Sequence, residues 1–197
     1  MKRVLCSVLI SFIALVMPTS VGARQIVIGL QAAPMEKLAA KELQRYLWQV
    51  SGVRLEITTG EDVSPGSFLI GQRQTNPLIE RLATEGKVLV SPADPGPQGY
   101  VLKHAVVGDK PVLVIAGSDA VGCLYGVYGL LESHFGLSFG IGGDVLPDER
   151  KSLDLTALDE RHAPSVPIRG FIPWSIFPQT TNYSWPIGSR SSTRWPS

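Results

Sequence analysis

The stretch that decides the fold is "AGSDAVGCLYGVYGLLESHFG", residues 116–136. Gly117 and Gly122 give the spacing G-x-x-x-x-G after an apolar run, which is half of a nucleotide-binding loop. The other half is missing. Cys123 and Leu124 stand where such a loop places the lysine that reaches the phosphates and the hydroxyl side chain that holds magnesium. The pattern therefore favours a packed helix over a phosphate loop.

The sequence indicates where this helix begins and ends. Ser118 or Asp119 is a suitable N-cap, and Gly136 is a suitable end. Its interior contains the glycines at 122, 126 and 129, each of which costs about 1 kcal/mol relative to alanine in a helix. Glycines spaced four and three residues apart lie on one face and allow a neighbouring backbone to come close. We therefore predict a structural helix-packing role for Gly122, Gly126 and Gly129.

The rest of the chain alternates between strand and helix patterns. Strands are expected at 25–29, 53–58, 67–71 and 87–90, helices at 34–51 and 77–83, and a hairpin over 99–117 that turns at Gly108-Asp109. This alternation predicts an α/β (α+β sandwich) fold, with a mixed β-sheet and helices packed on it.

The N-terminus has the features of a secretory signal peptide. Lys2 and Arg3 precede an apolar run over 4–17, and Pro18 and small residues up to Ala23 follow it. A run of this length is short of the ~20 residues that span a bilayer, so stable membrane insertion is not expected. We predict a signal peptide over 1–23 and export to the periplasm or the extracellular space.

Composition excludes several classes of protein. Hydrophobic residues make up 44% and charged residues 18%, which is typical of a globular domain. Loss of Lys2 and Arg3 from the 18 basic residues leaves 16 against 17 acidic ones, a formal charge of −1, so nucleic acid is not an expected partner. The exported part keeps one cysteine, Cys123, which predicts a buried free thiol. The three histidines are scattered without an H-E-x-x-H pair, so neither a metal site nor a cofactor is expected.

The same helix region carries a family resemblance. "VIAGSDAVGCLYGVYGLLESHFGLSF" resembles the helix and strand that close the N-terminal α/β domain of secreted glycoside hydrolases, notably β-N-acetylhexosaminidases and α-glucuronidases. Asp119, Gly122, the Leu-Tyr-Gly-Val-Tyr core at 124–128, Leu131-Glu132 and Gly136 follow the family's order. "AAKELQRYLWQVSG" (39–52) is similar to the first helix, and the likeness covers most of 25–175. It implies a zincin-like topology without metal, a catalytic barrel as partner in a full-length relative, and an oligo- or polysaccharide as ligand.

No catalytic residue is predicted. Glycoside hydrolysis usually needs two carboxyl groups around the scissile bond, but Asp148-Glu149 and Asp159-Glu160 lie in polar connecting segments and are expected to be solvated. "PSVPIRGFIPW" (164–174) resembles the start of the catalytic barrel. The resemblance maps a sugar-contacting arginine onto Arg169, although a salt bridge between domains remains open for it. Trp174 is a second candidate for substrate binding, by stacking on a sugar or by burial in a barrel strand.

These observations predict four segments: the signal peptide 1–23, an α/β accessory domain 24–158, a linker and first barrel strand 159–175, and an irregular tail 176–197. A barrel needs about 250 residues, so the catalytic part is expected to be absent and the chain to be an inactive fragment of an exported glycoside hydrolase. Two alternatives stay open. One is a free-standing secreted carbohydrate-binding module, and the other is a nucleotide-binding α/β domain.

Overall fold

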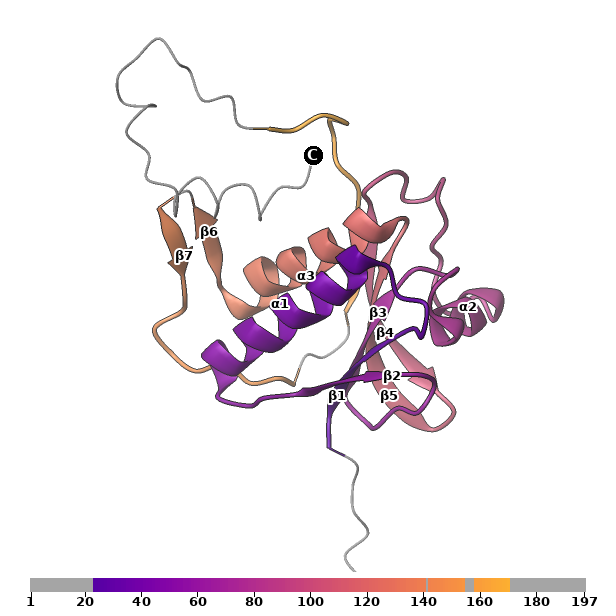
Figure 1. Cartoon of the computed structure of the whole chain (residues 1–197), viewed down its shortest axis with the longest axis horizontal. Helices are drawn as coiled ribbons and strands as arrows, with labels where there is room; N and C mark the ends of the chain where they lie inside the picture. The colour runs from indigo at the N-terminus through magenta and orange to yellow at the C-terminus, as the bar shows by residue number, and fades with distance from the viewer. Residues whose placement is uncertain (1–22, 141, 155–157, 171–197) are drawn as a thin grey trace, which may run out of the picture.

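The protein contains a six-stranded mixed β-sheet with the strand order β2-β1-β3-β5-β4-β8 (Figure 1). The computed structural model describes residues 23–140, 142–154 and 158–170. The strands are β1 (Gln25–Ile28), β2 (Glu56–Thr59), β3 (Ser67–Gly71), β4 (Tyr100–Val107), β5 (Lys110–Gly117) and β8 (Asp159–His162). β1, β2, β3 and β5 pair in parallel, whereas β4 is antiparallel to both of its neighbours.

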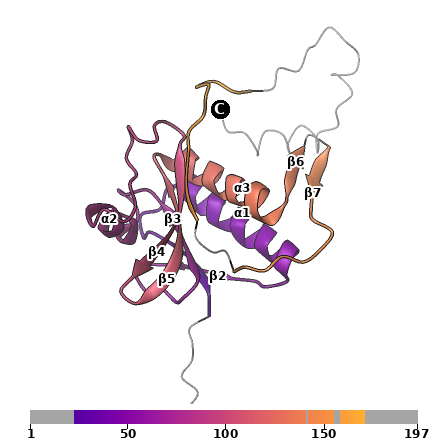
Figure 2. The same cartoon turned by 180° about the vertical axis from the view of Figure 1, so that it is seen from behind.

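Helices cover both faces of this sheet. α1 (Pro34–Ser51) and α3 (Ala120–Phe135) lie side by side on one face, and α2 (Pro77–Thr84) lies on the opposite face (Figures 1 and 2). The mixed sheet with packed helices that the sequence predicts is therefore confirmed.

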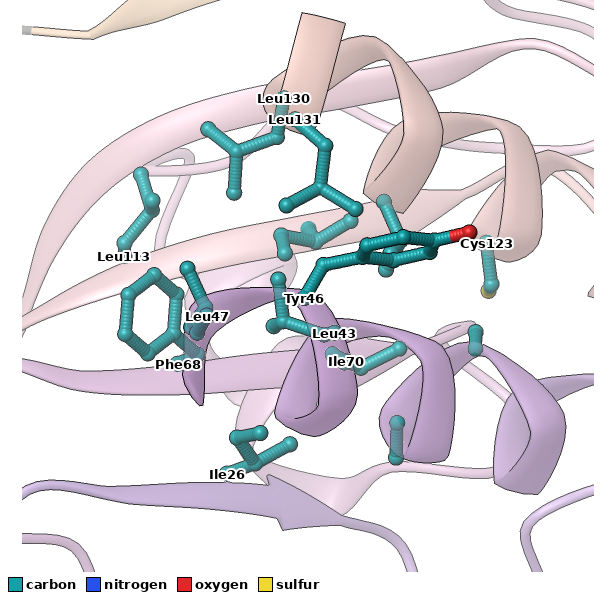
Figure 3. Close-up of a cluster of buried hydrophobic side chains, with 14 of the residues drawn as sticks. Ile26, Leu43, Tyr46, Leu47, Phe68, Ile70, Leu113, Cys123, Leu130 and Leu131 are labelled. Atoms are coloured by element: carbon teal, nitrogen blue, oxygen red, sulfur yellow. The ribbon is translucent and has the colours of Figure 1, made fainter. Parts of the chain in front are cut away.

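The central strands bury side chains on both faces, which divides the core into two clusters. Ile26, Phe68 and Leu113 point toward α1 and α3, where they meet side chains such as Leu43 and Leu130 (Figure 3). The alternate residues of the same strands pack against α2 on the other face: Val27, Leu69, Val112 and Val114. Burial on both faces explains why these strands read as continuous apolar runs rather than as an alternating pattern.

The predicted helix ends are confirmed. Asp119, rather than Ser118, caps α3, because its Oδ1 accepts a hydrogen bond from the Gly122 amide at 2.7 Å. α3 ends at Gly136, which has a left-handed backbone with φ +72°. The predicted hairpin is also present, with Val107 paired to Lys110 across the Gly108-Asp109 turn.

The predicted strand at 87–90 is wrong. The amides of Lys87 and Val88 donate to the Leu82 carbonyl at the end of α2 (2.9 and 3.2 Å), so this backbone closes a helix instead of pairing in a sheet. The apolar residues Val88 and Val90 are buried and Leu89 is exposed, which imitates a strand pattern in the sequence. The strand expected over 53–58 begins later, at Glu56.

Two further pairings follow α3. β6 (Ser138–Gly140) and β7 (Gly143–Val145) form a separate hairpin, which is attached to α1 where the Tyr46 hydroxyl donates to Asp144 at 2.5 Å. The residues Asp159–His162, expected in a connecting segment, form the edge strand β8 on β4. Edge strands pair on one side only, so "DERH" needs no apolar pattern to join the sheet.

Within the described residues, none of the helices combines the length and apolar character that crossing a membrane requires.

Candidate functional site

A pocket of about 390 Å³ lies beside the outer face of α3. One wall is α3 itself, and the opposite wall is the segment 163–169, which follows β8. Tyr100, at the start of β4, lies between them. The described residues that line it are Gln98, Tyr100, Tyr125, Tyr128, Gly129, Glu132, Phe139, His162, Ala163, Pro164, Ser165, Val166 and Arg169.

The glycines of α3 give Tyr100 its place in this pocket. A Cβ atom on Gly129 would come within 2.1 Å of the Tyr100 hydroxyl oxygen, and one on Gly126 would meet the Tyr100 ring at 3.3 Å. A Cβ on Gly122 would lie 2.2 Å from the Gly99 carbonyl oxygen, one residue before β4. The three glycines therefore allow α3 to lie directly against the start of β4.

β8 supplies one edge of the pocket. The His162 ring stacks on the Tyr100 ring with centroids 4.9 Å apart. Glu160 contacts two histidines, one on α3 and one on its own strand. Its Oε1 lies 2.9 Å from His134 Nε2, and its Oε2 lies 3.2 Å from His162 Nε2. The contact between Glu160 and His134 attaches the edge strand to the C-terminal half of α3.

Arg169 lies in the pocket and contacts the α/β domain. Its Nη2 donates to Gln98 Oε1 at 2.6 Å and its Nη1 donates to the Val166 carbonyl at 3.0 Å. The guanidinium carbon is 5.0 Å from the Tyr125 ring centroid. The backbone of Gln98 is held by Asp119, whose Oδ2 accepts from the Gln98 backbone amide at 2.8 Å. The N-cap of α3 thus anchors the loop that carries Gln98.

Burial shifts the titration of several pocket groups. It raises the pKa of Tyr100 to about 12, with smaller contributions from the negative charges of Glu132 and Glu160. Burial, followed by the charge of Glu42, raises the pKa of Tyr128, whose hydroxyl donates to Glu42 at 2.9 Å. Burial also raises the pKa of Glu132. The shifts of the half-buried Tyr100 and Tyr128 indicate a poorly hydrated surface, because removal of water penalises the charged form, whereas Glu132 is exposed.

The glycine loop before α3 is filled by the protein's own carboxylate. Asp119 accepts hydrogen bonds from the amides of Gly122 and Gln98, the kind of donors that a bound phosphate would need. A Cβ on Gly117 would come within 2.4 Å of the Cys123 amide nitrogen, so the loop is closely packed on the helix. This geometry disfavours the nucleotide-binding alternative.

The predicted pairs of acidic residues occupy different surroundings. Asp148 and Glu149 are exposed. Asp159 forms an exposed ion pair with Lys103 at 2.8 Å, whereas Glu160 is half-buried between the two histidines. No group of three or more His, Cys, Asp or Glu side chains suited to a metal ion occurs in the part of the chain that the structure describes.

Of the two residues predicted to bind substrate, Arg169 lies in the pocket and Trp174 falls outside the described residues. Both oxygens that Arg169 contacts are neutral, so it forms no salt bridge with the described residues. Sequence reasoning missed Gln98, Tyr100 and His162. They lie in a loop, at the start of β4 and on the edge strand β8, and no short sequence pattern indicates that these three places meet. The spacing of Tyr125, Tyr128 and Glu132 does place them on one face of a helix.

The comparison with family models agrees with the resemblance. The family model of the glycosyl hydrolase family 67 N-terminus matches residues 19–130, which is more than half of the chain. No curated protein matches. Among solved structures, the chain is similar to a family GH115 4-O-methyl-alpha-glucuronidase with specificity for decorated arabinogalactans. The likeness has a TM-score of 0.47 and 20% identity, over 73% of this chain and 18% of the other.

A GH138 enzyme that targets pectin rhamnogalacturonan II is also similar, with a TM-score of 0.33 and 13% identity over 56% of this chain and 14% of that one. The chain therefore spans less than a fifth of either enzyme's length. The assignment rests on the family model, which covers the sheet from β1 through β5 and most of α3. This chain belongs to the family defined by the glycosyl hydrolase family 67 N-terminus.

Proposed function

We propose that this domain is the non-catalytic N-terminal part of an exported glycoside hydrolase and works beside a separate catalytic domain. The observation that carries the proposal is the family match over residues 19–130. The pocket agrees with it. Glu132 is the one carboxylic side chain among its described lining residues, whereas hydrolysis of a glycosidic bond usually needs a pair. The described domain then supplies a folded support and leaves the bond cleavage to the catalytic domain.

The boundary of the accessory domain belongs after β8 in this proposal. β8 pairs with β4 from Tyr100↔His162 to Lys103↔Asp159, so residues 159–162 share the sheet of the domain. The linker toward a catalytic barrel accordingly starts near Ala163 rather than at Asp159.

An activity assay tests the non-catalytic role. The purified chain is incubated with aryl-glucuronides and aryl-N-acetylhexosaminides, with a full-length family relative as the positive control. We expect aryl release at the rate of the protein-free blank. Enzyme-like turnover that disappears in Glu132→Gln would contradict the proposal, because it would show that the pocket carboxyl performs acid or base catalysis.

Export is tested separately by the mature N-terminus. The full chain is expressed in a secreting host and the exported product is analysed by mass spectrometry. We expect a mature protein that begins at Arg24, since the signal features end at Ala23. A matched variant with two aspartates in the apolar run 4–17 should remain inside the cell. Recovery of the unprocessed chain in the cell interior would argue against export.

A further inference from the structure

We propose that the pocket between α3 and the segment 163–169 is a saccharide-binding subsite that holds a sugar ring without hydrolysing it. This activity would belong to the α/β domain together with the first residues of the linker that follows β8, in addition to the proposed accessory role. The two proposals can fail separately. If the pocket binds no sugar, the family assignment and the outcome of the activity assay stay unaffected.

Aromatic side chains from three elements line the pocket. Tyr125 and Tyr128 come from α3, Tyr100 comes from β4, and the His162 ring of β8 stacks on the Tyr100 ring. A sugar ring has apolar C–H faces and a polar edge, so it suits a site that offers ring faces beside a few polar groups. Small-molecule sites in general are mostly apolar with a few oriented polar side chains, and they span about 300–1,000 Å³. The pocket, at about 390 Å³, lies within this range.

The polar groups have the geometry that hydroxyl recognition needs. Arg169, Gln98 and Glu132 present planar groups that donate or accept two hydrogen bonds at a time. Arg169 has five N–H donors, and its two contacts with Gln98 and Val166 leave further donors for a ligand. The two hydrogen bonds from Arg169, to Gln98 Oε1 and to the Val166 carbonyl, orient the guanidinium before a ligand arrives. Pre-orientation lowers the entropy that binding costs.

The charges of the pocket suit either a neutral or an acidic sugar ring. Arg169 contacts neutral oxygens, so within the described residues no carboxylate offsets its charge. Glu132 places an acidic group with a raised pKa elsewhere on the lining. A neutral ring would use Arg169 as a hydroxyl donor, and an acidic ring would place its carboxylate there. The shared chemistry is a sugar ring stacked on tyrosine, and the choice between the two is left to the experiment.

Titration calorimetry on the full chain tests the subsite with three probes: a neutral xylo-oligosaccharide, a chitooligosaccharide and an oligosaccharide that carries a uronic acid. We expect measurable binding of at least one probe. Tyr125→Ala and Arg169→Ala should each weaken it tenfold or more. Trp48→Ala is the matched control, because Trp48 is an exposed aromatic residue on α1 that does not line the pocket, and it should bind as the unaltered chain does.

A second measurement removes the dependence on how well the variants fold. Amide chemical shifts of the unaltered chain are recorded with and without the binding probe, and the changes should concentrate at Gly129, Glu132 and His162. The proposal is overturned if none of the probes binds at millimolar concentration. It is equally overturned if binding survives both pocket substitutions, or if the shift changes concentrate on α1 or α2.

Discussion

Gly129 lies where a larger side chain does not fit, because a Cβ atom there would come within 2.1 Å of the Tyr100 hydroxyl oxygen and 2.8 Å of its Cζ. In an exposed helix, alanine in place of glycine stabilises by about 1 kcal/mol. The contact with Tyr100 reverses that sign. Glycine is unfavourable for the helix itself, but its lack of a side chain leaves room for the tyrosine of the neighbouring strand.

Gly129→Ala is expected to destabilise the fold by about 1–3 kcal/mol, the usual cost of forcing extra volume into a packed contact. Urea unfolding followed by circular dichroism measures the change in the free energy of unfolding. Ser133→Ala is the matched control, because Ser133 is exposed on the same helix, and its effect should stay within about 0.5 kcal/mol. A Gly129→Ala variant more stable than the unaltered chain would show that Tyr100 does not pack there.

Glu36 connects α1 to the loop between β3 and α2, and its side chain is fully buried. Its Oε1 accepts hydrogen bonds from the Gln72 amide at 2.9 Å and from the Thr75 hydroxyl at 2.5 Å, and its Oε2 accepts from the Ala33 amide at 2.5 Å. One carboxylate thus satisfies the start of a helix and the end of a parallel strand. A buried donor that loses its partner costs about 1–3 kcal/mol.

Glu36→Ala is therefore expected to lower the free energy of unfolding by at least ~2 kcal/mol, because the backbone amides of Ala33 and Gln72 and the Thr75 hydroxyl lose the carboxylate that accepts from them. Glu36→Gln, which keeps one oxygen acceptor, should lose less. Chemical denaturation compares both with Glu85→Ala, which removes an exposed ion pair with Lys87 and should change stability by less than about 1 kcal/mol. A fully stable Glu36→Ala variant would refute this account of the loop.

His104 attaches β4 to the residues before β8 through its uncharged form. Its Nδ1 accepts a hydrogen bond from the Leu158 amide at 3.0 Å, which a protonated ring could not do. Burial lowers the pKa of His104 below its ordinary value of 6.5. The unfolded chain therefore takes up this proton at a higher pH than the folded chain.

The stability that His104 contributes is fully present above about pH 6.5 and is lost as the pH falls through the folded pKa. His104→Asn keeps an acceptor that does not titrate, so this part of the pH dependence should vanish. The free energy of unfolding is measured for both proteins at pH 5 and pH 7. The drop toward pH 5 should be smaller in the variant, and equal drops would exclude His104 as the cause.

At the scale of the whole molecule, β8 forms the edge of the sheet although about fifty residues separate it from its partner β4 in the sequence. It covers the outer edge of β4, and Lys103–Asp159 and His134–Glu160 add contacts at 2.8 and 2.9 Å. An uncovered edge strand exposes unpaired amides and carbonyls, which promotes pairing with another chain. The six-stranded sheet thus includes the residues through His162.

A chain shortened to end at Leu158 is expected to unfold at a lower urea concentration and to self-associate more than a chain that ends at Gly170. Denaturation gives the midpoints, and sedimentation velocity gives the oligomeric state. Two chains with the same midpoint and the same sedimentation would place β8 outside the cooperative unit.

Local residue patterns predicted most of the elements. Strand β3, "SFLIG", and helix α3 with Asp119 and Gly136 at its ends were found because short-range chemistry decides them: apolar runs, caps and left-handed glycines. The strand predicted at 87–90 was wrong for a local reason as well. An alternating apolar pattern reports which side chains are buried, and Lys87 and Val88 use their amides to close α2 instead.

The sequence by itself determined the mixed α/β class, the helix at 120–135 and the buried thiol of Cys123, because each depends on neighbours within a few positions or on composition. Tertiary structure alone decided that "DERH" becomes the sheet's edge, and that Gln98, Tyr100, His162 and Arg169 meet in one pocket. The physical reason is distance along the chain. Contacts between segments this far apart are set by how helices and strands pack, and no local pattern records that packing.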